Sequence, residues 1–418
     1  MRAEWFLPPR RIAAKVPGAW ARGITRNILL LAVASLLTDV SSEIILPLLP
    51  LFLFALGADF LILGVIESVG ESAVSLLKIV SGHASDRLGR RKPFVAFGYG
   101  FSTLTKSFLP VAGSWLHVLA ARVGDRTGKG VRDPPRDALI AESTSPETVG
   151  KAFGFHRAMD TTGAIAGPLI VLLLLPVLTA TRGEMAAFRD LFLLAVVPAF
   201  LAFLVVLLVR EVRSPPKPGL RLRVGLRGLP VRLRLFILVA GLHSFANFSI
   251  TFAIVLAAQV AASAGYGVAA AQAFAVFIYL LMNVVYALLA AQAGSLSDRI
   301  GRKPVLLAGY AALIAGSLLF AVAREPLLLL PAFLAFGISY AFVEGTERAL
   351  VADLSPKEIR GTSLGTYHAA VGLGKLPSSL VAGVLATVVA PWAAFLSGAA
   401  IATVAATLLV GAFAEPKR

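Results

Sequence analysis

The longest uncharged stretch of the chain sets the strongest limit on its fold. Residues 235–297 contain no Asp, Glu, Lys or Arg, and the string Ser263-Ala264-Gly265-Tyr266-Gly267 divides them. About 20 apolar residues cross the roughly 30 Å hydrocarbon core of a bilayer as a helix, because lipid offers backbone groups no hydrogen-bond partners. The stretch therefore predicts two membrane-spanning helices. The uncharged residues 376–414, divided by Pro391-Trp392, predict two more.

The composition excludes most other classes of protein. Hydrophobic residues make up 57% of the chain and charged residues 15%, against about 45–50% and about 25% in soluble domains. Neither a soluble globule nor a disordered chain fits these values. The absence of cysteine removes disulfide frameworks, thiolate metal sites and cysteine nucleophiles. We therefore expect an all-helical protein that crosses the membrane many times.

Runs of the same kind predict twelve membrane-spanning helices in two halves. The seventh is expected as one continuous span over 235–262, and the fourth, over 115–140, is the least apolar. The fourth is retained because the basic loops around it would otherwise fall on opposite sides of the membrane. The predicted organisation is a tail at 1–26, a six-helix bundle at 27–209, a basic linker at 210–234, a second six-helix bundle at 235–413 and a tail at 414–418.

The distribution of Lys and Arg predicts the orientation. If the N-terminus is inside, the outer loops carry Arg182, Arg189 and Arg324, and most of the 39 basic residues lie in inner loops and tails. Cytoplasmic loops carry an excess of Lys and Arg, so we expect both termini in the cytoplasm and the protein in the inner membrane. The net charge of +16 then reflects topology and attraction to anionic lipid. No nucleic-acid partner is expected, because the basic residues are scattered over short loops.

An internal repeat supports the division into halves. One string occurs in each half, as Gly82-His83-Ala84-Ser85-Asp86-Arg87-Leu88-Gly89-Arg90-Arg91-Lys92-Pro93 and as Gly294-Ser295-Leu296-Ser297-Asp298-Arg299-Ile300-Gly301-Arg302-Lys303-Pro304. Asp86 and Asp298 are 212 residues apart, about half the chain. A second match, between 138–142 and 349–353, is shifted by 211 residues. Two matches at nearly the same spacing predict a duplicated architecture.

At these strings the sequence resembles the major facilitator superfamily, whose loop between helices 2 and 3 carries Gly-x-x-x-Asp-Arg/Lys-x-Gly-Arg-Arg/Lys. Both copies match every position. The resemblance implies twelve membrane-spanning helices in two pseudo-symmetric six-helix bundles, with alternating access to a midplane site between them. Residues 38–43 and 125–142 further resemble a prokaryotic branch of this superfamily. We expect such a protein to function as a monomer.

The repeated motif also has a physical account that does not depend on the family. Glycine permits close helix contact and a turn of positive φ, and Asp86 can accept charge-assisted hydrogen bonds from neighbouring arginines. We expect the two copies to gate the cytoplasmic side. The residues concerned are Gly82, Asp86, Arg87, Gly89, Arg90, Arg91, Gly294, Asp298, Arg299, Gly301, Arg302 and Lys303. The alternative is a basic inner loop that records topology alone.

A glycine pattern on the fifth helix resembles the signature of drug:proton antiporters. Gly154, Gly163, Gly167 and Pro168 match it, whereas the next glycine of the family pattern is replaced by Val171. Small residues also allow two membrane helices to pack tightly. The pattern is therefore explained equally well by an antiport function and by helix packing alone.

Several ionisable or polar residues fall within the predicted spans. The set is Asp39, Glu43, Glu67, Glu71, Arg122, Asp125, Arg126, Lys129, His243, Asn247, Glu344 and Glu347. A charge at the bilayer centre costs at least about 2.5–3.5 kcal/mol, so these groups are expected to line a polar cavity as a substrate and proton pathway. Some of them could instead form structural ion pairs, and His243 could be a packing residue. Lys375 has no evident partner in the sequence.

The function favoured by these features is secondary transport of a small organic or amphiphilic compound by proton-coupled export. Asp39, Glu43, Glu67 or Glu71 is the expected proton carrier, and the proton gradient the driving force. Uptake of an organic anion on the basic stripe of the fourth helix is the first alternative. A membrane sensor or lipid scramblase that moves no soluble solute is the second.

No motif in the sequence indicates an enzyme. The string Gly124-Asp125-Arg126-Thr127-Gly128-Lys129-Gly130 is one residue short of a phosphate-binding loop and lacks Ser or Thr after the lysine. The five histidines lie on separate segments without ligand spacing, and no Gly-x-Ser-x-Gly string occurs. We therefore expect neither enzymatic activity nor a bound metal or cofactor.

Overall fold

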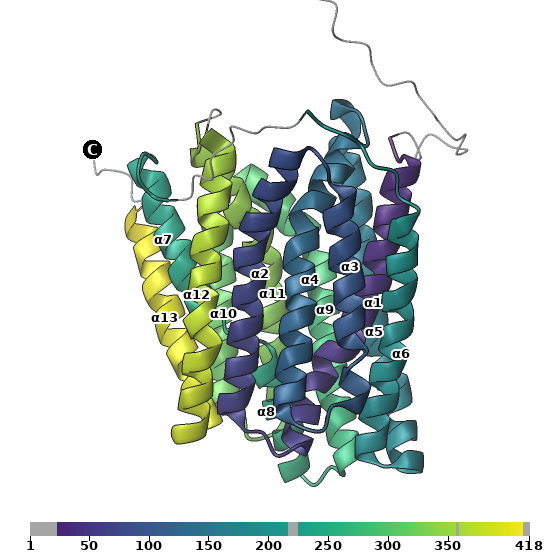
Figure 1. The fold of residues 1–418 in the computed structure, drawn as a ribbon. Coiled ribbons are helices and arrows are strands. Elements are labelled where there is room, and N and C mark those ends of the chain that lie inside the picture. The colour runs from purple at the N-terminus through teal and green to yellow at the C-terminus, as the bar shows by residue number, and fades with distance from the viewer. Residues whose placement is uncertain (1–22, 216–224, 357–358, 413–418) are drawn as a thin grey trace, which may run out of the picture.

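The computed structural model describes residues 23–215, 225–356 and 359–412, and these residues form helices and no strand. The first half consists of α1 (Arg26–Ala55), α2 (Phe60–Leu88), α3 (Lys92–Lys106), α4 (Trp115–Glu142), α5 (Val149–Arg182) and α6 (Glu184–Leu207). The second half consists of α7 (Val231–Ala246), α8 (Thr251–Ser263), α9 (Val268–Ile300), α10 (Arg302–Val322), α11 (Pro326–Leu354), α12 (Arg360–Val388) and α13 (Pro391–Ala412). The long helices run side by side along one axis (Figure 1). Because α7 and α8 together form one span, the predicted fold of two six-helix bundles is confirmed.

The ends of the bundles lie close to the predicted limits. The first half ends with α6 at Leu207, and α7 begins at Val231, earlier than the expected 235. Most of the predicted tails and the central part of the linker, namely 1–22, 216–224 and 413–418, lie outside the described residues. Their assignment as tails and linker stays a prediction.

Ten of the spans in the described part of the chain are long and apolar enough to cross a membrane. The remaining two are α3, which is only 15 residues long, and α4, which carries the charged stripe. Large apolar side chains such as Leu173, Leu288 and Val388 are exposed on the outer surface of the bundle. Lipid tails can cover such side chains, whereas water cannot do so without cost.

The seventh span is broken, so its prediction as one continuous helix was wrong. The chain leaves helical geometry between Ala246 and Thr251. There the backbone N–H of Ser249 donates to Ser379 Oγ at 3.2 Å, and Ser249 Oγ donates to Glu67 Oε2 at 2.9 Å. A side chain of α12 thus provides a backbone partner that a continuous helix would have provided for itself, and Glu67 of α2 binds the Ser249 hydroxyl.

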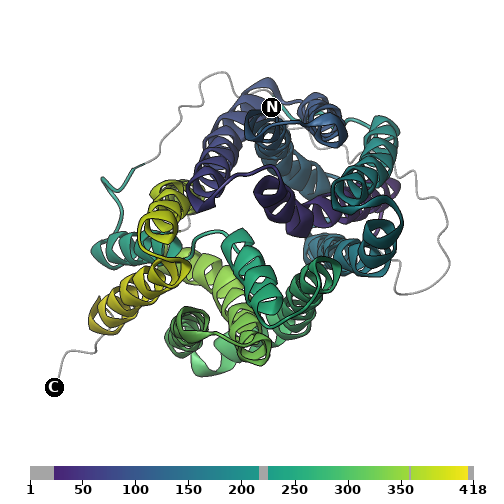
Figure 2. The same ribbon diagram turned by 90° about the horizontal axis from the view of Figure 1, so that it is seen from below.

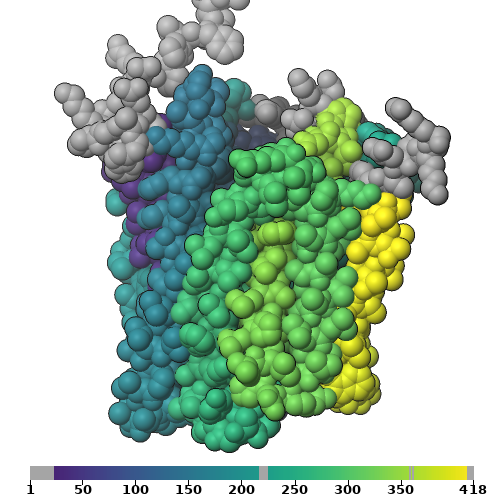
Figure 3. All heavy atoms as spheres, turned by 180° about the vertical axis from the view of Figure 1, so that it is seen from behind, coloured from purple at the N-terminus to yellow at the C-terminus, as the bar shows by residue number. Residues whose placement is uncertain are grey.

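The two halves meet along two pairs of helices. Figure 2 shows the N-terminal and C-terminal helices as two groups that face each other. One contact joins α2 to α12, and the other joins α5 to α9, which lie side by side on the face shown in Figure 3. At the first contact, a Cβ added at Gly64 would lie 2.4 Å from the Ser379 carbonyl oxygen, so only glycine permits this approach of the backbones.

Among the described residues, an apolar core joins the halves at one end only. We call the end at which α2 leads into α3 the motif end, at the top of Figure 1, and the opposite end the closed end. At the closed end one buried cluster contains residues of both halves, and the rings of Phe60 and Phe252 stack across the boundary at 5.7 Å. At the motif end each half has a separate cluster, around Ile28 in the first and around Phe236 in the second. The molecule is therefore sealed at the closed end.

Labelling of introduced cysteines tests this seal, because the native sequence has no cysteine. In detergent, Ile79→Cys should react readily with a maleimide, because Ile79 lines a wide cavity at the motif end. Ala253→Cys should react only after unfolding, since Ala253 is 1% exposed. Glu325→Cys, an exposed position at the closed end, is the control for reagent access. Equal rates for Ala253→Cys and Glu325→Cys would contradict the seal.

Candidate functional site

A polar cavity lies between the two halves. Its deep part encloses about 340 Å³ and is lined by α1, α4 and α5 from the first half and by α9 and α11 from the second. A wider space of about 780 Å³ continues towards the motif end and reaches Gly82 and Asp86. The two spaces share Asp39, Lys129, Arg157, Asp160 and Glu344. A solute can therefore enter from the motif end and reach the middle of the molecule.

Ten of the twelve predicted pathway residues line this cavity or a side pocket next to it. Asp39, Glu43, Arg122, Asp125, Arg126, Lys129 and Glu344 line the deep part. Glu67, Glu71 and Asn247 line the side pocket of about 150 Å³, which also contacts Arg122 and Arg126. The remaining two, His243 and Glu347, line none of these spaces.

Glu67 and Arg122 form a buried ion pair between α2 and α4. One guanidinium nitrogen of Arg122 donates to Glu67 Oε1 at 3.0 Å and to Oε2 at 3.2 Å. Their side chains are 2% and 6% exposed, and Ser249 adds a hydrogen bond to the same carboxylate from the second half. Such a pair satisfies both charges, so neither group is available to a substrate without breaking it.

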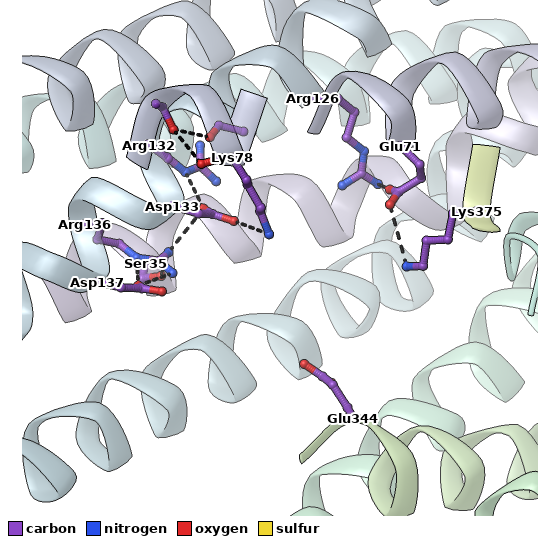
Figure 4. Close-up of polar contacts among 12 residues, drawn as sticks. Ser35, Glu71, Lys78, Arg126, Arg132, Asp133, Arg136, Asp137, Glu344 and Lys375 are labelled. Atoms are coloured by element: carbon purple, nitrogen blue, oxygen red, sulfur yellow. Dashed lines mark hydrogen bonds and ion pairs between the residues drawn. The ribbon is translucent and has the colours of Figure 1, made fainter. Parts of the chain in front are cut away.

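Glu71 forms a second set of ion pairs that crosses between the halves. Its carboxylate lies 3.5 Å from Arg126 of α4 and 3.7 Å from Lys375 of α12. Figure 4 shows Glu71 between these two bases. Lys375 therefore has a partner that its own sequence neighbourhood does not reveal. The partner belongs to the other bundle.

A buried lysine that the sequence analysis missed pairs with Asp125 of α4. Lys106 of α3 is 1% exposed and lies 3.5 Å from Asp125. Its ammonium group donates to Ser42 Oγ at 2.8 Å and to Ser41 Oγ at 3.2 Å, and Ser102 donates to Asp125. The feature of the sequence that could have revealed Lys106 is a single basic residue at the end of an otherwise apolar span.

Among the described residues, Asp39 and Glu43 of α1 are the carboxylates of the deep cavity that have no basic partner. In the described part of the chain, Asp39 forms no ion pair and no hydrogen bond. Glu43 accepts one hydrogen bond, from the Tyr279 hydroxyl of α9 at 2.7 Å. Asp160, which the sequence analysis did not select, lies 3.5 Å from the His156 ring, and its Oδ1 is buried without a donor. The deep cavity thus has an acidic wall.

The opposite wall carries a carboxylate that is already paired. Glu344 extends from α11 (Figure 4), accepts a hydrogen bond from the Tyr286 hydroxyl at 2.6 Å and lies 3.4 Å from Arg157. Arg348 adds a third contact at 3.0 Å. Arg157 belongs to α5, so this group is another connection between the halves.

His243 and Glu347 lie inside the second half, so the expectation that they line the cavity was wrong. The Glu347 carboxylate accepts hydrogen bonds at 2.8 Å from Tyr310 and from Tyr367. The His243 ring lies 3.6 Å from Glu347 and stacks on Tyr310 at 3.8 Å. Two tyrosine hydroxyls satisfy the carboxylate, so it needs no contact with the cavity. For His243, the alternative of a packing residue fits this placement.

The two copies of the motif form equivalent clusters, one in each half. In the first, Arg91 lies 2.6 Å from Asp86 and 3.0 Å from Glu142 and donates to Ser85 Oγ. In the second, Arg302 pairs with Asp298, lies 3.0 Å from Asp353 and donates to Ser297 Oγ. Each cluster ties the end of the motif helix to the end of α4 or α11 within its own half. In this conformation neither cluster joins the two halves.

The clusters explain the two spacings of the internal repeat. Asp86 and Asp298 are 212 residues apart, whereas Arg91 and Arg302 are 211 apart, as are Glu142 and Asp353. The first loop therefore contains one extra residue between the glycine and the arginine that binds. Gly89 and Gly301, with φ of 64° and 92°, allow these turns.

The other basic residues of the motif have different positions. Arg87, Arg90 and Arg299 are exposed, and the Lys303 ammonium donates to the Val410 carbonyl at 3.2 Å. Burial disfavours the charged form of Arg91, but its bonds with Glu142 and Asp86 outweigh this effect and raise its pKa above the ordinary value. Arg91 therefore keeps its positive charge at any physiological pH.

Substitution of Arg91 and Arg90 distinguishes a structural cluster from a basic loop that records topology alone. Arg91→Ala should lower the melting temperature, because it removes the hydrogen bonds to Glu142 and Ser85 at a cost of about 1–3 kcal/mol. Arg90→Ala, at an exposed position, should leave it unchanged within about 0.5 kcal/mol. Thermal unfolding in detergent is the measurement. Equal effects of the two substitutions would favour the topology interpretation.

The glycines of α5 set the distance to the acidic residues of α1. A Cβ added at Gly163 would lie 2.8 Å from Asp39 Cβ, and one added at Gly167 would lie 2.6 Å from Glu43 Cβ. A Cβ at Gly154 would meet nothing within 4 Å. Gly163 and Gly167 therefore allow α5 to pack closely against α1 at Asp39 and Glu43. Val171, at the departure from the pattern, is buried in the closed-end core.

Alanine at these glycines tests the packing explanation. Gly167→Ala should destabilise the protein by about 1–3 kcal/mol, because the added methyl group overfills the contact between α1 and α5. Gly154→Ala should be neutral or stabilise by roughly 0.5–1 kcal/mol, since alanine favours a helix. Thermal unfolding reports both effects. A Gly167→Ala protein as stable as the native one would contradict the close contact.

Comparison with known proteins decides the family. The sequence pattern described as Major Facilitator Superfamily matches residues 31–285 and 236–418. The chain belongs to the Major Facilitator Superfamily. A relative described as an uncharacterized MFS-type transporter, from Methanocaldococcus jannaschii, is 38% identical over 93% of this chain and 95% of its own. The protein is thus a multi-pass membrane transporter of this superfamily.

More distant members show where the similarity ends. The multidrug resistance protein MdtH of Cronobacter sakazakii is 28% identical, but over only 36% of this chain and 37% of its own. The crystal structure of the nucleoside transporter NupG has a TM-score of 0.74, covers 94% of this chain and 100% of its own, and is 16% identical. At that identity the likeness to this Major Facilitator Superfamily structure shows the fold alone.

Proposed function

We propose that this transporter exports a small organic compound in exchange for protons by alternating access. One observation carries the proposal. Arg122 and Arg126 of the cavity are paired with Glu67 and Glu71, and Arg157 with Glu344, whereas Asp39 and Glu43 face the cavity without a basic partner among the described residues. Apart from Lys129, the charged groups left free to bind are therefore acidic.

An unpaired carboxylate in this position favours proton uptake. Removal of a carboxylate from bulk water is costly unless a base, a proton or a cation offsets the charge. Glu43 also reaches across to Tyr279 of the second half, so its charge affects a contact between the halves. Protonation of Glu43 changes that contact from a charge-assisted hydrogen bond to a weaker neutral one. This supplies a link between proton binding and movement of the halves.

The distribution of apolar cores supports alternating access. The closed end has one core shared by both halves, and the motif end has two separate cores. A rocking movement that separates the shared core and brings the other two together would open the opposite side. The contacts of α2 with α12 and of α5 with α9 are suitable axes, because they join the halves along their length.

The direction of transport follows from the proposed orientation. The excess of Lys and Arg in the motif-end loops supports a cytoplasmic location for that end and for both termini. The cavity then opens to the cytoplasm and can load a compound for export. The partial similarity to MdtH, a protein described as conferring multidrug resistance, agrees with export.

Uptake of an organic anion receives less support from the cavity. Its binding surface would be the basic stripe of α4, but Arg122 and Arg126 are engaged by carboxylates. Among the described residues Lys129 is the member of that stripe in the deep cavity without an ion pair. A single ammonium group next to several carboxylates is a poor anion site.

Neutralising substitutions test the proton carriers. The native protein and its variants are reconstituted into proteoliposomes that contain a pH dye, and a pH gradient is imposed. A panel of cationic, neutral and anionic organic compounds is then added. With the native protein, an exchanged compound should dissipate the gradient. Glu43→Gln and Asp39→Asn should each reduce that proton movement at least tenfold, because an amide takes up no proton.

The control is Glu147→Gln, which changes an exposed loop carboxylate and should behave like the native protein. Compound exchange without a pH gradient should survive in Glu43→Gln, since the cavity remains. If both cavity variants still coupled compound movement to protons at the native rate, these two residues would not be the carriers. Accumulation of anions inside right-side-out liposomes would favour uptake instead.

A further inference from the structure

One buried ionisable cluster takes no part in the proposed exchange. It lies inside the second half, where α7, α10, α11 and α12 meet at the carboxyl group of Glu347. Tyr310 of α10 and Tyr367 of α12 each donate to this group at 2.8 Å, and the His243 ring of α7 lies 3.6 Å from it. All four residues are at most 5% exposed. We call them the second-half cluster.

The cluster has no positive charge that balances an ionised Glu347. The two tyrosines offer hydrogen bonds without charge, and among the described residues His243 is the one basic side chain within ion-pair distance. A buried ion pair is favourable only with good hydrogen-bond geometry, and 3.6 Å is too long for a hydrogen bond. A neutral imidazole beside a protonated carboxyl group therefore suits this interior better than two charges.

The charged groups around the cluster are engaged elsewhere. Arg348, next to Glu347 on α11, and Lys375 of α12 act on Glu347 through space. Arg348 pairs with Glu344 at 3.0 Å, and Lys375 lies 3.7 Å from Glu71. Helix α13, which packs on α7, contains no ionisable residue. A proton is thus the remaining means of neutralising the carboxyl group.

Packing alone does not explain the imidazole of His243. Its ring stacks on Tyr310 at 3.8 Å, and an apolar ring could form the same stack. Its Nε2 atom is buried without a hydrogen-bond partner, which is unfavourable in a protein interior. The ring has one property that an apolar ring lacks, which is the ability to accept a proton.

The two helices that carry the ionisable pair both reach the first half. After the end of α7, Ser249 donates to Glu67 of α2 at 2.9 Å. On α11, Glu344 lies one turn from the cluster and 3.4 Å from Arg157 of α5. The first contact lies beside the seam of α2 with α12, and the second beside the seam of α5 with α9. A change of charge in the cluster therefore acts on both connections between the halves.

We propose that Glu347 is a second proton-binding site, separate from the cavity, with His243 as the base that exchanges its proton. The protonated cluster is neutral and stable in this conformation. Loss of the proton leaves a buried negative charge, which favours movement of α7 relative to α11. His368 follows Tyr367 on α12 and lines the wide cavity, so the proton has a short route to water at the motif end.

This inference goes beyond the proposed function, which places protons on Asp39 and Glu43. The site lines none of the cavities described above, so its proton binding can be measured without any transported compound. It rests on the proposed function only where transport is the readout.

Infrared difference spectroscopy tests the site in the full-length protein in lipid bilayers, titrated from acidic to alkaline pH. A protonated carboxylic acid has a C=O stretching band that a carboxylate lacks. One such titrating band should be present in the native protein and absent from Glu347→Gln, which keeps the size of the side chain. Glu325→Gln, at an exposed position of the closed end, is the matched control and should keep the band.

Two further variants test the neighbours of the carboxyl group. His243→Gln should move the midpoint of the titration by about one pH unit or more, because it removes the adjacent base. Tyr367→Phe should move the band to higher frequency, because the carboxyl group loses one hydrogen bond. Both variants retain Glu347, so they test the site even if Glu347→Gln fails to fold.

Transport gives a second readout. In the proteoliposomes described above, the pH dye reports proton movement, and the amount of compound in the vesicles is measured in parallel. Glu347→Gln should move fewer protons per compound than the native protein, by about one, because an amide takes up no proton. Glu325→Gln should keep the native ratio.

Several results would overturn the inference. They are an unchanged set of bands in Glu347→Gln, a band that does not titrate while the protein stays folded, a native midpoint in His243→Gln, a native frequency in Tyr367→Phe, or a native proton ratio in Glu347→Gln. The proposed exchange fails separately. A titrating Glu347 band in a protein that moves no protons with any compound would remove the exchange and leave the site, whereas coupled transport without that band would remove only the site.

Discussion

Every charge within the membrane needs a partner, and this requirement organises the structure. Most of the ionisable groups on α2, α3 and α4 meet it with one another, as in Glu67 with Arg122 and Lys106 with Asp125. These pairs hold the first half together where apolar packing is interrupted, and Glu71 extends them to Lys375 of the second half. The groups that lack a partner are thereby marked as the ones available to protons and solutes.

The fold could be predicted from the sequence because two long-range signals agreed. Uncharged runs of membrane-spanning length and a repeated Asp-Arg motif both require a duplicated helical bundle. The break in the seventh span was not predictable, because its cause is tertiary. Ser249 leaves the helix to bond with Glu67 and Ser379, residues far away in sequence. Hydropathy does not report such partners.

The site was predictable in part for the same reason. Twelve ionisable or polar residues were selected because they fall within predicted spans, and ten of them line the cavity or its side pocket. Lys106 is isolated in its span, so its role depends on which helices become neighbours. Arg157 and Asp160 are three positions apart on α5, and the sequence analysis overlooked this spacing. Glu347 shows the converse. It follows Glu344 by three positions, yet Tyr310 and Tyr367 hold it inside the second half.

The seal at the closed end is made of contacts between apolar side chains, whereas the seam of α2 with α12 includes an ion pair. These two kinds of contact respond differently to temperature, because apolar association weakens on cooling and an ion pair does not share that dependence. Chilling should therefore loosen the seal relative to the seam and favour the state in which the opposite side is accessible. Temperature alone should therefore shift the relative populations of the two access states, before any solute binds.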